Sequence, residues 1–93
     1  MTLTLMWEAA AAPGRGPELL AWAREAAAAL PGGHLRREFF TAPGDRILVL
    51  TWWPAQEAGP ELPAPPAALT RRDVHRWRFT SVEVEEHRDG TAP

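Results

Sequence analysis

The sequence predicts an α+β fold: a ferredoxin-like, four-stranded antiparallel sheet with one main helix and a short or irregular second crossover. Four stretches have strand-like patterns, whereas residues 18–30 carry apolar residues at the helical period. In chain order the elements are strand, helix, strand, strand, Pro-rich connection and strand, the split βαβ pattern with its second helix reduced. A chain of 93 residues suffices for one domain. We expect that domain at residues 1–88, with a flexible tail at 89–93.

The first strand and the helix are predicted from a change of period. Residues 2–8 alternate apolar and polar side chains, with Trp7 on the apolar face. Pro17 suits the first turn of a helix, because the N–H that it lacks would be unpaired there. Residues 18–30 then form a narrow, Ala-rich apolar stripe with Trp22 at its margin. We expect this helix to lie close to the sheet, with the two Trp side chains in one layer.

The next two strands form a predicted hairpin. Residues 34–41 and 46–53 are strand-like, and the Ala-Pro-Gly-Asp sequence at 42–45 is typical of a tight turn. The second of these strands is apolar on both faces, with Trp52 and Trp53 pointing in opposite directions. A strand with two apolar faces is expected to be covered on both.

The rest of the chain is predicted to be a connection and a last strand. Five Pro residues at 54–70 leave room only for a short helix near 67–71. Residues 74–87 read as a long strand whose pattern changes parity, which predicts a bulge near 80–81. One face of its first half carries His75, Trp77 and Phe79.

The composition excludes several classes of chemistry. All ten basic residues are Arg, and Lys, Tyr, Cys and Asn are absent, a usage typical of a GC-rich genome. Schiff-base, thiolate and Cys-ligated zinc sites are therefore excluded, and Ser81 is the only Ser. A net charge of −2 argues against nucleic-acid binding, and no apolar run is long enough to span a membrane. We expect a cytoplasmic protein without a cofactor, and without a metal because its three His are widely spaced.

The same pattern predicts a homodimer. One helix and a Pro-rich connection can cover only one face of a four-stranded sheet. The strand at 46–53 nevertheless has apolar residues on both faces. A second copy of the chain is the simplest cover for the other face.

Several segments resemble the antibiotic biosynthesis monooxygenase-like family. They are the Trp-Glu-Ala end of the first strand, the Pro-Gly-Arg-Gly-Pro-Glu-Leu-Leu loop, the Phe-Phe-Thr-Ala-Pro-Gly-Asp-Arg hairpin and the Leu-Thr-Trp-Trp strand. The resemblance implies a dimeric α+β barrel, with a pocket in each subunit between sheet and helices. Some members oxidise aromatic polyketides or quinols with O₂ and no cofactor. They also use Tyr and Asn, which this chain lacks.

Candidate site residues are those with chemistry suited to a small aromatic substrate. We predict His75 as a proton acceptor and Arg37 as the group that stabilises an oxyanion. Alternatively, His75 lies at the rim of an aromatic dimer interface, and Arg37 pairs with Glu8 or another acid. The predicted substrate-binding residues are Trp22, His34, Trp52, Trp77 and Phe79.

The sequence is consistent with two functions. One is a cofactor-independent monooxygenase acting on a small aromatic or quinol-like substrate. The other is a non-catalytic dimer that binds a hydrophobic ligand or serves as an accessory protein. An enzyme requires an enclosed cavity into which His75 or His34 points. Trp side chains that fill the space between helix and sheet would argue against the oxygenase.

Overall fold

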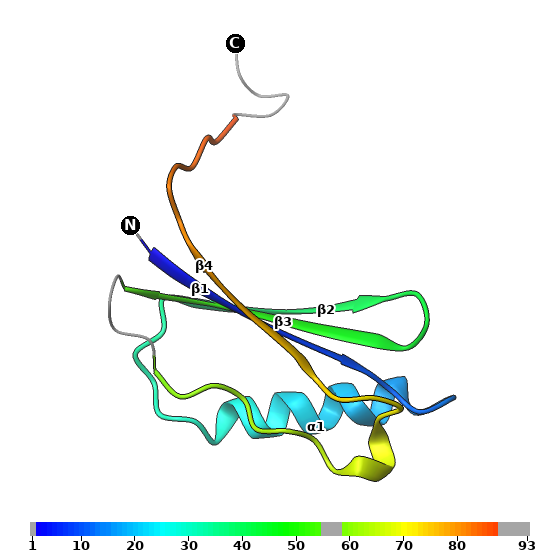
Figure 1. The fold of residues 1–93 in the computed structure, drawn as a ribbon. Coiled ribbons are helices and arrows are strands. Elements are labelled where there is room, and N and C mark those ends of the chain that lie inside the picture. The colour runs from blue at the N-terminus through cyan, green and yellow to red at the C-terminus, as the bar shows by residue number, and fades with distance from the viewer. Residues whose placement is uncertain (1, 55–58, 88–93) are drawn as a thin grey trace.

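The computed structural model describes residues 2–54 and 59–87. They form a four-stranded antiparallel sheet with one helix, α1, on one of its faces (Figure 1). The sheet order is β2-β3-β1-β4, which is compatible with a ferredoxin-like fold and confirms the predicted α+β class. The elements are β1 (Thr2–Ala10), α1 (Gly16–Ala28), β2 (Arg36–Ala42), β3 (Arg46–Pro54), a short 3₁₀ helix η1 (Ala67–Leu69) and β4 (His75–Thr80).

Helix α1 begins and ends two residues earlier than predicted. Pro17 lies in its first turn, as expected. The predicted end at Leu30 is wrong, because the helix stops at Ala28. Leu30 precedes Pro31, whose ring disfavours the helical conformation in the residue before it. The Leu30 N–H instead bonds to the Ala27 carbonyl at 3.1 Å, which tightens the last turn.

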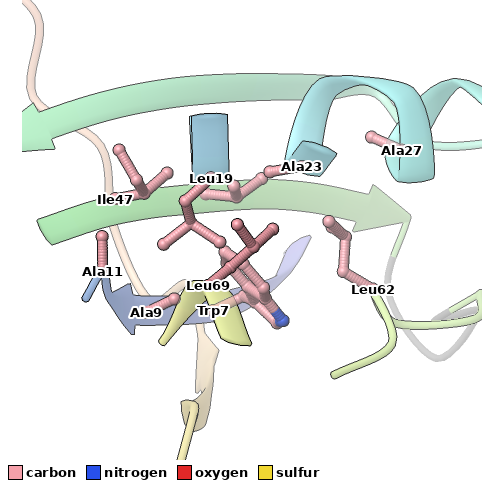
Figure 2. Packing of buried hydrophobic residues seen from close by; sticks show 10 residues of the cluster. Trp7, Ala9, Ala11, Leu19, Ala23, Ala27, Ile47, Leu62 and Leu69 are labelled. Atoms are coloured by element: carbon pink, nitrogen blue, oxygen red, sulfur yellow. The ribbon is translucent and has the colours of Figure 1, made fainter. Parts of the chain in front are cut away.

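The core lies between α1 and the sheet (Figure 2). The buried stripe of α1 is formed by Leu19, Ala23 and Ala27, and the two Ala side chains let the helix approach the sheet closely. Trp7 stacks against Trp22 with ring centroids 6.2 Å apart, which confirms that they share a layer. Buried side chains from the sheet and from the connection complete the cluster: Ala9, Ala11, Ile47, Val49, Leu62 and Leu69.

Strand β3 has two apolar faces that are covered unequally. Ile47, Val49 and Trp53 are buried on the side of α1. Leu48 and Leu50, on the other side, are only half-buried. Figure 1 shows α1, η1 and the chain before β4 on one side of the sheet. We call the opposite side the open face, because nothing in the described part of the chain covers it.

The last strand is shorter than predicted. A short helix was expected near residues 67–71, and η1 confirms it. The predicted strand at 74–87 with a bulge is wrong, since β4 ends at Thr80 and residues 81–87 are not in a strand. The reason is the length of its partner: the Ser81 N–H bonds to the Thr2 carbonyl at 2.8 Å, at the first residue of β1. Beyond that point β1 offers nothing to pair with.

A close contact between Gly59 and Trp53 gives a test of the core. A Cβ at Gly59 would lie 2.7 Å from Trp53 Cζ2 and Cζ3, closer than real Cβ atoms approach. Because the Trp53 ring is buried, it cannot move away freely. We expect Gly59→Ala to lower the free energy of unfolding by about 1–3 kcal/mol in urea titrations. Gly32→Ala is the matched control, since a Cβ there meets nothing within 4 Å. Equal stabilities of the two variants would contradict this packing.

Candidate functional site

The predicted site residues divide between the two faces of the sheet. His75 pairs with Glu8 in the β1–β4 register, and both lie on the open face. Arg37 pairs with Thr51, whose side chain is buried on the side of α1. Within one protomer Arg37 and His75 therefore lie on opposite faces of the sheet. They cannot act together on one bound substrate, as was predicted. Trp52, Trp77 and Phe79 lie with His75 on the open face, whereas Trp22 and His34 lie on the helix side.

Cross-strand pairing arranges the open face in rows. Trp52, Thr4 and Phe79 form one row across β3, β1 and β4. In the next row Met6 lies between Leu50 and Trp77. Side chains in such rows contact one another directly across the sheet. The open face is thus a continuous, mainly apolar surface.

The aromatic residues at the β4 edge are the most exposed part of this surface. Trp77 is 66% exposed and Phe79 47%, and their ring centroids lie 6.0 Å apart. Trp52, nearer the β2 edge, is instead covered by the Arg36 guanidinium, whose Cζ lies 5.3 Å from the ring centroid. The exposed aromatic surface is therefore concentrated beside His75.

A hollow of about 710 Å³ lies at this edge of the open face. Of the predicted site residues, His75 and Trp77 line it, and Trp52 and Phe79 do not. The other lining residues are Met6, Glu8, Leu48, Val74 and Arg76. The hollow thus combines apolar walls with a few polar groups, as small-molecule sites do.

Glu8 is the centre of a charged cluster that sequence reasoning missed. Its side chain is 15% exposed, and its Oε1 accepts a hydrogen bond from Arg72 Nη2 at 2.8 Å. His75 Nδ1 lies 3.3 Å from the same oxygen, and Arg46 Nη1 lies 3.7 Å from Oε2. The predicted alternative that Arg37 pairs with Glu8 is wrong, because the two residues lie on opposite faces. The alternation of residues 2–8 places Glu8 and Trp7 on opposite faces of β1, but the strand registers are needed to place Arg37 on the Trp7 side.

Arg37 and His34 lie beside a separate, shallow hollow on the helix side. Arg37 Nε donates to Thr51 Oγ1 at 3.1 Å, and burial lowers the pKa of the guanidinium. Within residues 2–54 and 59–87, no carboxylate forms an ion pair with Arg37. The His34 ring packs edge-on against Trp53, with centroids 5.9 Å apart. These residues line about 420 Å³ between the end of α1 and β2.

Trp7 and Trp53 fill the middle of the helix side of the sheet. Trp7 and Trp53 are 4% and 3% exposed, and only about 10 Å³ remains beside them. That volume is too small for a ligand. The hollow that remains between α1 and the sheet in the described residues is the open one beside Arg37 and His34.

Among residues 2–54 and 59–87, no three His, Cys, Asp or Glu side chains are grouped so that they could hold a metal ion. Over the same residues, no helix has the length and apolar character needed to cross a membrane.

Comparison of the chain with protein-family models, with curated proteins and with solved structures gave no match. The resemblance to the monooxygenase-like family therefore stays a prediction.

Proposed function

We propose that the protein is a homodimer that binds a small aromatic molecule on the open face of its sheet. The observation that carries the proposal is the exposed pair Trp77 and Phe79 next to a hollow that contains His75. Large, contiguous patches of exposed apolar side chains are typical of interaction sites and rare elsewhere on soluble proteins.

The dimer supplies the cover that one chain lacks. Two copies related by a twofold axis would pack the rows of Leu50, Met6 and Trp77 against each other. Residues 81–87 extend beyond the sheet with Val82 87% and Val84 72% exposed. In Figure 1 this segment continues past the start of β1, where it is available to contact a second protomer. A face-to-face dimer would bury all of these apolar side chains.

The hollow has the size and lining for a small ligand. Its volume of about 710 Å³ lies within the range of about 300–1,000 Å³ typical of ligand sites. Met6, Leu48 and Trp77 offer apolar contact, and His75 offers one polar group that can fix orientation. In one chain the hollow is open to solvent, so the site is incomplete until the second copy closes it.

Binding of a hydroxyanthraquinone probe tests this proposal. We expect saturable binding by calorimetry, weakened about 3- to 10-fold by Trp77→Ala through loss of aromatic stacking. Trp77 is mostly exposed in the chain, so its replacement should leave the fold intact. Leu35→Ala is the control, because Leu35 is also a large exposed apolar residue and does not line the hollow. Absence of saturable binding to the wild type would overturn the proposal.

Cofactor-independent oxygenation is the second candidate function. It requires the second protomer to enclose the open-face hollow, because Trp7 and Trp53 fill the middle of the helix side, where an enclosed cavity was expected. The observation that favours it is the position of His75 beside Trp77 in the hollow, where it can accept a proton from a bound substrate. In such a reaction the substrate anion itself reduces O₂. An activated CH₂ group then becomes a carbonyl, and the second oxygen atom leaves as water. The enzyme contributes a base, orientation and exclusion of water.

A further inference from the structure

We propose that Glu8 and His75 form a proton-accepting dyad, in which Glu8 is the positioning residue and Nε2 of His75 takes the proton from a bound aromatic phenol or enol. This inference depends on the proposed ligand site, and specifies the chemistry of the ligand.

The register of the sheet brings the two side chains together. Glu8 of β1 lies directly opposite His75 of β4, and both side chains point to the open face. Nδ1 of His75 is 3.3 Å from Glu8 Oε1. A carboxylate can only accept hydrogen bonds, so in a neutral His75 ring the tautomer that suits this contact carries its hydrogen on Nδ1. Nε2 then carries the free lone pair.

Glu8 is itself held in place from two other segments. Arg72 Nη2 donates to Oε1 at 2.8 Å, and Arg72 Nη1 donates to the Asp73 carbonyl at 3.0 Å. Arg46 of β3 approaches the second carboxylate oxygen at 3.7 Å. Because both oxygens have a cationic neighbour, rotation of the carboxylate away from His75 would break existing contacts. This is the arrangement expected of a group that orients another side chain.

The charge of the cluster indicates the class of ligand. One carboxylate faces two guanidinium groups, which leaves a net formal charge of +1 while His75 is neutral. An excess positive charge beside apolar walls stabilises an anion that forms there. A planar aromatic compound that becomes negatively charged on losing a proton, such as a phenol or an enol, fits both properties of the hollow.

The step is a single proton transfer. The O–H bond of the substrate breaks, its electron pair remains on the substrate oxygen, and the proton forms a bond to Nε2. The resulting imidazolium is stabilised through Nδ1 by the Glu8 carboxylate, and the substrate anion by the surplus positive charge. No other reactant is needed for this step.

The tautomer of His75 is the first test. Long-range proton–nitrogen NMR spectra identify the protonated ring nitrogen, and His75→Gln assigns the signals. We expect hydrogen on Nδ1 in the wild type, and loss of this preference in Glu8→Gln. Glu38→Gln is the matched control, because Glu38 is also a carboxylate of the open face but pairs with Arg36 at 2.6 Å on the β2 side. Hydrogen on Nε2 in the wild type, or an unchanged tautomer in Glu8→Gln, overturns the dyad.

Oxygen consumption with anthrone and quinol probes is the second test. We expect His75→Gln to lower kcat by about 10²- to 10⁴-fold, the usual contribution of a general base. Glu8→Gln should lower kcat by about 10-fold or more with KM nearly unchanged, since the carboxylate acts through His75. Glu38→Gln should match the wild type.

The outcomes separate this inference from the proposed function. No oxygen uptake by the wild type, or equal uptake by His75→Gln, overturns the role of the dyad in catalysis. The hydroxyanthraquinone binding measurement still decides whether the ligand-binding site exists. A wild type that binds the probe but shows neither the tautomer nor the uptake is a binding protein without this dyad.

Discussion

Trp77→Glu is expected to convert the proposed homodimer into a monomer that keeps its fold. Trp77 is 66% exposed in the single chain, so its replacement should lower the stability of the monomer only slightly. In a face-to-face dimer the new carboxylate would be buried without a partner, which costs several kcal/mol. We expect the dissociation constant to rise at least about 100-fold. Light scattering at micromolar concentration measures the mass, and circular dichroism checks the fold.

Leu35→Glu is the control for this experiment. Leu35 is also a large apolar residue, 59% exposed, but it lies outside the open face. The same kind of substitution there should leave the dimer intact. A monomeric wild type, or a dimeric Trp77→Glu variant, would show that the open face is not the interface.

Leu19→Ala is expected to have the largest effect on stability. Leu19 is fully buried in the first turn of α1, between the helix and the sheet. Removing a buried Leu side chain typically lowers the free energy of unfolding by about 2–5 kcal/mol, because apolar contacts are lost and a cavity remains. This is a large part of the about 5–15 kcal/mol that stabilises most domains.

Urea titration at one fixed protein concentration measures this loss, since dissociation of a dimer would contribute to it. Leu35→Ala is the matched control, and we expect it to change stability by less than about 0.5 kcal/mol because Leu35 is exposed. A loss at Leu19 no larger than at Leu35 would contradict the core shown in Figure 2.

Local patterns were sufficient to predict the elements that depend on nearby residues. The alternation in residues 2–8 and the Ala-rich stripe of α1 placed Trp7 and Trp22 in one layer, and the structure confirms this. The two apolar faces of β3 were also predicted correctly. The end of β4 was predicted wrongly, because it is set by the start of β1 at Thr2, which is far away in the sequence. A pattern within one strand carries no information about where its partner stops.

The candidate site was predictable only in part, for the same reason. Strand parity correctly placed His75, Trp77 and Phe79 on one face. Parity alone could not show that Arg37 is on the other face, since this requires the β1–β3 and β2–β3 registers. The contacts of Glu8 with Arg72 and His75 join residues that are more than sixty positions apart. Such contacts follow from the order of the strands in the sheet, and they cannot be predicted from the spacing of residues in the sequence.

The position of β1 between β3 and β4 has a consequence for how the chain folds during synthesis. The hairpin of β2 and β3 can form early, but β1 reaches its final pairing only when β4, near the end of the chain, has been made. Until then β1 has an unpaired edge next to an uncovered apolar face, a combination that favours aggregation. Because Glu8 lies on β1 and His75 on β4, the charged cluster is also complete only in a fully folded chain. A ribosome-bound or truncated chain without its last strand would therefore present the apolar surface without the proposed dyad.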